Sequence, residues 1–85
     1  MYSKAEVYRL IKLALAPLGR TDEPHNYGVA RDRSSGRLII YFDLPYVSPL
    51  QFNIEFDGGD IGREALVALI GQAIERRLEI RSSTP

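Results

Sequence analysis

The chain has 85 residues, eleven basic and eleven acidic side chains, one histidine and no cysteine. The length predicts a single domain, and the lack of cysteine excludes disulfides and thiolate metal sites. The zero net charge argues against a protein that mainly coats nucleic acid or an anionic membrane. No apolar run approaches the roughly 18 residues of a bilayer span, and no signal-peptide pattern is visible, so we expect a cytoplasmic protein.

The first predicted element is a helix over residues 4–18. Ser3 and Glu6 have the spacing of a capping box, which indicates that the helix begins at Lys4. An apolar stripe at helical spacing follows along these residues. Pro17 cannot lie inside a regular helix without removing a hydrogen bond, so the helix is expected to end or distort near it.

Three strand-like runs come next, at residues 27–31, 37–43 and 50–57. Residues 32–36 between the first two are typical of a tight hairpin turn, with Gly36 available for a positive φ. The middle run is apolar on both faces, which favours a central strand. The third alternates between apolar and polar residues, which predicts one buried face and one exposed face.

A second helix is predicted from Asp60, as N-cap, to about residue 80. We expect residues 1–80 to form one compact domain and residues 81–85 to be a frayed tail. The order α-β-β-β-α predicts an α+β fold, a three-stranded antiparallel meander with both helices packed on one face. The face expected to meet the helices carries Leu38, Ile40, Phe42, Phe52, Ile54 and Phe56.

The opposite face of this sheet is predicted to carry Ile39 and Tyr41, with Tyr27 and Val29 beside them. An apolar strip on an uncovered sheet face is typical of a protein contact. The loop at residues 44–49 contains two prolines around Tyr46, which suits either a second contact anchor or a side chain folded back over the core edge. We therefore predict a non-enzymatic, cofactor-free interaction domain. We expect a homodimer or a subunit or modulator of a larger assembly. Small, cysteine-free chains with no catalytic chemistry are frequent among short phage-encoded and accessory bacterial proteins.

The alternative hypothesis is nucleic-acid binding through three arginines that bracket the first hairpin turn, Arg31, Arg33 and Arg37. Arginines in a projecting turn can hold phosphates. The order of elements resembles that of the double-stranded-RNA-binding domain, which uses its first hairpin loop to reach a minor groove. That resemblance also implies a lysine-rich motif at the start of the second helix, whereas residues 60–64 here are mixed in charge.

A third hypothesis is a metal-dependent enzyme, because Asp43, Glu55 and Asp57 could converge across the second hairpin on a divalent cation. The order of elements is similar to the start of many metal-dependent nucleases. Those enzymes usually place a lysine two residues after the strand glutamate, and here that residue is Asp57. With His25 as the single histidine and no cysteine, the sequence contains no catalytic constellation, and we predict that the protein is not an enzyme.

Overall fold

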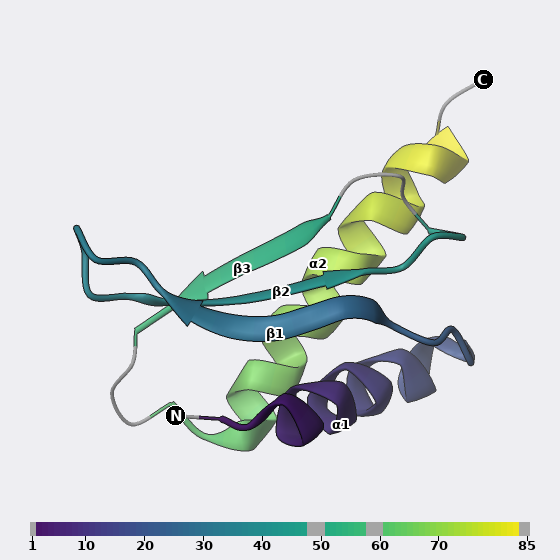
Figure 1. Ribbon diagram of the computed structural model, residues 1–85. Helices are drawn as coiled ribbons and strands as arrows, with labels where there is room; N and C mark the ends of the chain where they lie inside the picture. The colour runs from purple at the N-terminus through teal and green to yellow at the C-terminus, as the bar shows by residue number, and fades with distance from the viewer. Residues whose placement is uncertain (1, 48–50, 58–60, 84–85) are drawn as a thin grey trace.

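The computed structural model describes residues 2–47, 51–57 and 61–83. Its helical elements are α1 (Lys4–Leu15), a 3-10 turn that extends it, η1 (Ala16–Leu18), and α2 (Arg63–Ser83). Its strands are β1 (His25–Arg31), β2 (Leu38–Asp43) and β3 (Phe52–Phe56). Figure 1 shows these elements in the predicted order, helix, strand, strand, strand, helix. The predicted α+β fold with an antiparallel meander is confirmed.

The ends of α1 follow from local sequence signals. The Ser3 Oγ accepts a hydrogen bond from the Glu6 backbone N–H at 3.2 Å, and the Glu6 carboxylate accepts one from the Ser3 backbone N–H at 3.3 Å. This is the reciprocal capping box that the sequence predicted. Pro17 lies in η1, which ends at Gly19 with a φ of 69°. The helix therefore distorts at the proline and stops at a residue that adopts the left-handed conformation without a steric penalty.

The second helix lies further along the chain than predicted, because α2 begins at Arg63 and continues to Ser83 instead of running from residue 61 to about residue 80, so residues 81–83 of the predicted tail are helical. The predicted N-cap, Asp60, lies outside the described residues. Along the part of the chain that the structure describes, no helix is both long and apolar enough to cross a membrane.

The sheet has β2 in its centre, with antiparallel neighbours on both sides. The hairpin turn between β1 and β2 is closed by the Asp32 N–H, which donates to the Arg37 carbonyl at 2.8 Å, and Gly36 adopts the expected positive φ of 74°. β1 also contains one extra residue, because His25 pairs with Asp43 but Gly28 pairs with Tyr41. Such a bulge locally bends a strand.

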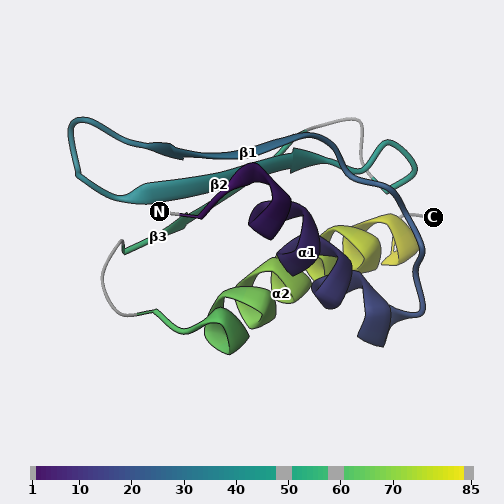
Figure 2. The ribbon, with the colours of Figure 1, turned by 60° about the horizontal axis from the view of Figure 1, so that its bottom comes forward.

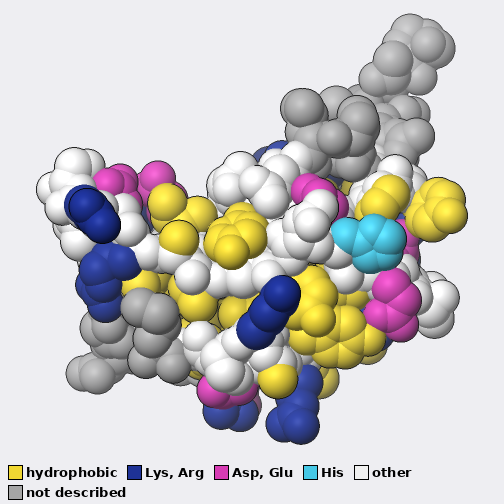
Figure 3. All heavy atoms as spheres, in the orientation of Figure 1, with side chains coloured by type: hydrophobic (Ala, Val, Ile, Leu, Met, Phe, Trp, Pro, Cys, Tyr) yellow, Lys and Arg dark blue, Asp and Glu magenta, His cyan; other side chains and the backbone are white. Residues whose placement is uncertain are grey.

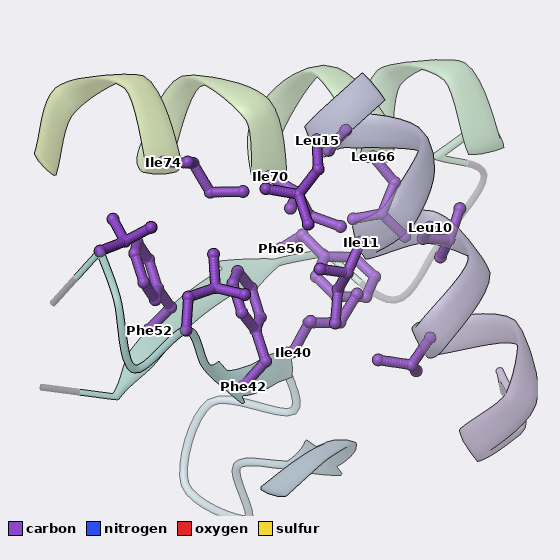
Figure 4. Packing of buried hydrophobic residues seen from close by; sticks show 14 of the residues in the cluster. Leu10, Ile11, Leu15, Ile40, Phe42, Phe52, Phe56, Leu66, Ile70 and Ile74 are labelled. Atoms are coloured by element: carbon purple, nitrogen blue, oxygen red, sulfur yellow. The ribbon is translucent and has the colours of Figure 1, made fainter. Parts of the chain in front are cut away.

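Both helices pack on the same face of the sheet, which we call the inner face (Figure 2). The strands contribute Leu38, Ile40, Phe42, Phe52 and Phe56 to the core between the layers. Residues from α1 and α2 fill it from the other side, including Ile11, Leu15, Leu66, Ile70 and Ile74 (Figure 4). The rings of Phe42 and Phe52, the last pair of the β2–β3 ladder, stack 4.8 Å apart within this core.

The pairing of β1 with β2 contradicts one prediction. Tyr27 and Val29 were expected on the same face of the sheet as Ile39 and Tyr41, and they lie on the opposite face. Val29 pairs with Ile40, so it shares the inner face, and both Tyr27 and Val29 pack against the core. The Tyr27 ring lies 5.5 Å from that of Tyr8 on α1. Residues that pair directly across two strands point to the same face, and the turn pairs Arg31 with Leu38. That pairing turns every second residue of β1 toward the helices.

Candidate interaction surface

The sheet face opposite the helices, here called the outer face, contains two rows of paired residues. One row is Gly28, Tyr41 and Asn53, and the other is Ala30, Ile39 and Glu55. Ile39 and Tyr41 lie in the middle of these rows and are half-buried. Figure 3 shows hydrophobic side chains on the upper side of the sheet, beside acidic and basic side chains near the hairpin turn. The outer face is therefore apolar in its centre and charged at its margin.

The side chain of Tyr41 leans across the sheet onto β1. A Cβ atom placed on Gly28 would lie 2.4 Å from the Tyr41 hydroxyl oxygen and 2.7 Å from the ring carbon that bears it. Gly28 is buried even though it lies on an edge strand, because this ring covers it. Sequence reasoning left Gly28 and Ala30 out of the surface, although a glycine inside a strand is a signal of such a close approach.

Two charged groups mark the opposite ends of the outer face along β2. Arg37, just before the strand, forms 3.5 Å ion pairs with the carboxylates of Glu55 and Asp57. Asp43, at the end of the strand, accepts a hydrogen bond of 2.8 Å from the Asn26 side-chain amide. The side chains that point outward along β2 and the residue before it, at positions 37, 39, 41 and 43, are thus basic, apolar, apolar and acidic in that order.

The loop after β2 exposes Tyr46 and buries the next residue, Val47. Tyr46 is 84% exposed, so it does not fold back over the core edge, whereas Val47 is fully buried. Tyr46 lines an open groove of about 500 Å³ together with Pro45, His25 and the connector residues 20–23. The two predicted contact anchors, Tyr41 and Tyr46, therefore belong to different surfaces, the outer face and this groove.

The structure places all three predicted phosphate-binding arginines at the hairpin turn, but two of them interact within the chain. An Arg31 Nη1 donates to the Gly36 carbonyl at 2.8 Å, and Arg37 is held between two carboxylates. Arg33 is exposed in the turn. The Ser34 hydroxyl and backbone N–H donate to Asp32, which lowers the pKa of that carboxyl and keeps it ionised beside the arginines.

The three carboxylates of the hypothetical metal site do not converge. Asp43 pairs with His25 at one end of the sheet, while Glu55 pairs with Ile39 and shares Arg37 with Asp57 at the other end. Within residues 2–47, 51–57 and 61–83, no group of three His, Cys, Asp or Glu side chains could hold a metal ion. The convergence on which the third hypothesis depends does not occur, because the length of β2 separates Asp43 from Glu55 and Asp57.

The perturbed carboxylates other than Asp32 belong to the helix layer. The Tyr8 hydroxyl donates to Glu23, which lowers the pKa of Glu23 and raises the pKa of Tyr8. The hydrogen bond from the Ser3 backbone lowers the pKa of Glu6, with a further contribution from Arg63 at 2.8 Å. These contacts join α1 to the connector before β1 and to α2. They lie on the helix side of the molecule, away from the outer face.

The chain matches no known family model, no curated protein and no solved structure. What it does has to be inferred from its own residues.

Proposed function

We propose that this chain is a non-enzymatic protein-interaction domain that binds through its outer face, as a homodimer or as a subunit of a larger assembly. The observation that carries the proposal is the pair of half-buried apolar side chains, Ile39 and Tyr41, on the sheet face opposite both helices. Burying apolar surface contributes about 25 cal/mol per Å², so a partner that covers this face gains stability from it.

The composition of the face also suits a protein contact. Tyrosine is enriched among the residues that dominate binding energy at interfaces, and charged rims around an apolar centre are usual there. The Tyr41 ring rests on Gly28, which restrains it before a partner arrives. A restrained side chain loses less conformational entropy on binding, which favours Tyr41 as the anchor.

The first part of the test asks whether Tyr41 is a surface residue. A Tyr41→Glu variant should remain folded, with a melting temperature close to that of the wild type, because its side chain can be solvated on the outer face. Unfolding of this variant at room temperature would make Tyr41 a core residue and end the proposal.

The second part asks whether a protein covers the face. Photo-crosslinking with p-benzoylphenylalanine in place of Tyr41, in the native cells, should yield a protein adduct. The same probe in place of Arg9, which is exposed on α1, is the matched control. No adduct from position 41, or equal yields from both positions, would contradict the proposal. The mass of the adduct separates a second copy of the chain from a different protein.

A further inference from the structure

We propose that the partner of the outer face is a second copy of this chain, stacked face to face with the strands antiparallel, so that Arg37 of each copy meets Asp43 of the other. This inference rests on the proposed function and adds the identity of the partner and the symmetry of the contact. A two-fold arrangement of this kind buries the same patch on both copies, as in most homodimers.

The register of the sheet supplies the symmetry. Val29, Ile40 and Ile54 form one row across the three strands. We place a two-fold axis between the two sheets, perpendicular to the strands and directly over this row. Each residue then faces the residue of the second copy that lies on the same strand at an equal distance on the other side of the row. On β2 it places Ile39 against Tyr41 of the second copy, and Arg37 against Asp43.

The same operation matches the remaining side chains on β3. Glu55 faces Asn53 of the second copy, and Asp57 faces Gln51, so no charge directly opposes a like charge. A stack with parallel strands would instead bring Arg37 against Arg37 and Asp43 against Asp43. Like charges placed directly opposite one another are destabilising, and this favours the antiparallel stack.

Arg37 is able to take a further carboxylate in this arrangement. Its ion pairs to Glu55 and Asp57 are 3.5 Å long and use Nη1 and Nε. A guanidinium has five N–H donors, so Arg37 can donate to Asp43 of the second copy without breaking either ion pair. Asp43 likewise retains acceptor sites beside the hydrogen bond that it accepts from Asn26.

The contact is expected to be weak. Three strands about 4.8 Å apart and six residues of about 3.3 Å each give a face of roughly 14 Å by 20 Å, which is small for a stable interface. Among the residues that the structure describes, the face also carries three carboxylates, Asp43, Glu55 and Asp57, against the guanidinium of Arg37. We therefore expect a Kd of roughly 10–100 µM, in the range of transient interfaces.

The decisive experiment mixes two charge-reversed variants, Arg37→Glu and Asp43→Lys. Each alone should self-associate at least about tenfold more weakly than the wild type, because its homodimer opposes like charges at two symmetric sites. An equimolar mixture should form a heterodimer. In it the introduced glutamate of one variant meets the introduced lysine of the other, and the native Asp43 meets the native Arg37 at the second site.

Sedimentation velocity between about 5 and 500 µM, which spans the expected Kd, measures the two variants and their mixture. The matched controls are Arg9→Glu and Glu75→Lys, exposed on the helices, which should dimerise like the wild type. A mixture that associates no better than either variant alone would contradict the pairing of Arg37 with Asp43.

A second pair of variants separates this geometry from a simple effect of net charge. Asp43→Asn and Asp57→Asn each remove one negative charge from the same face. The antiparallel stack predicts that Asp43→Asn weakens the dimer several-fold, whereas Asp57→Asn tightens it, because Asp57 adds only repulsion between the copies. If both changes shift the Kd in the same direction, the proposed pairing is wrong.

The outcomes also separate this inference from the proposed function. A wild type that stays monomeric up to about 1 mM, a concentration that would populate even a weak dimer, overturns the second copy as partner. The adduct from position 41 then decides whether another protein uses the face. A wild-type dimer that Tyr41→Glu disrupts, but that Arg37→Glu and Asp43→Lys do not affect, leaves the face in use and rejects the antiparallel stack.

Discussion

The two faces of the sheet are made by the same three strands and have opposite properties. Ile40 and Phe42 point inward and are fully buried beneath the helices, while their neighbours Ile39 and Tyr41 point outward and are half-buried. On β2 and β3 the charged side chains follow the same division, because Arg37, Asp43 and Glu55 all lie on the outer side. The comparison teaches that hydrophobicity alone does not identify a core position in β2. The packed helices do.

The largest effect is expected from truncating adjacent isoleucines on the two faces. Ile40→Ala should lower the free energy of unfolding by about 3 kcal/mol, because it opens a cavity in a fully packed core. Ile39→Ala should cost less than about 1 kcal/mol, since that side chain is half-buried on the surface. Urea denaturation of both variants, at protein concentrations well below the dimer Kd, measures the difference. Equal losses would show that the outer face is covered within the chain.

An intermediate effect is expected at the contact between Gly28 and Tyr41. Gly28→Ala places a methyl group 2.4 Å from the tyrosine hydroxyl oxygen, so the ring has to move off β1, at a cost of about 1 kcal/mol. In a Tyr41→Ala background the same change should cost nothing, which gives a coupling of about 1 kcal/mol in a double-mutant cycle. Independent effects in the cycle would mean that the ring does not rest on Gly28.

The smallest effect is expected when the three arginines of the hairpin turn are changed and binding to nucleic acid is measured. Fluorescence anisotropy with labelled duplex RNA and DNA should detect no binding by the wild type at about 50 mM salt, because Asp32, Glu55 and Asp57 place negative charge beside the arginines of the hairpin turn and the chain has no net charge. Changing Arg31, Arg33 and Arg37 together to glutamine should then leave the signal unchanged. Micromolar binding that weakens steeply by about 200 mM salt, and that the triple variant loses, would favour the hairpin over the outer face.

Local signals in the sequence were sufficient for the elements and for their order. The capping box at Ser3 and the proline at position 17 determine where α1 starts and distorts, since both act on backbone hydrogen bonds within a few residues. The alternation along β3 likewise identified Phe52 and Phe56 as core residues. These predictions held because each depends on contacts between residues close together in the chain.

The predictions that failed depend on which residues face one another across strands. Alternation shows that Tyr27 and Val29 share a face, but the turn length, which pairs Arg31 with Leu38, decides that this face is the inner one. In the same way, spacing in the sequence did not show that Asp43 lies at the opposite end of the sheet from Glu55 and Asp57. The distance between residues on neighbouring strands depends on how the strands are paired, which the spacing in the sequence does not reveal.

The sequence by itself thus determined the α-β-β-β-α order, the ends of α1, the hairpin turn and the identity of most core residues, because hydrophobic period and capping are local. Only the tertiary structure decided that Tyr41 rests on Gly28, that Val47 is buried while Tyr46 is displayed, and that Arg37 lies beside Glu55 and Asp57. The physical reason is that strand register and helix docking bring together residues whose separation along the chain carries no record of their contact.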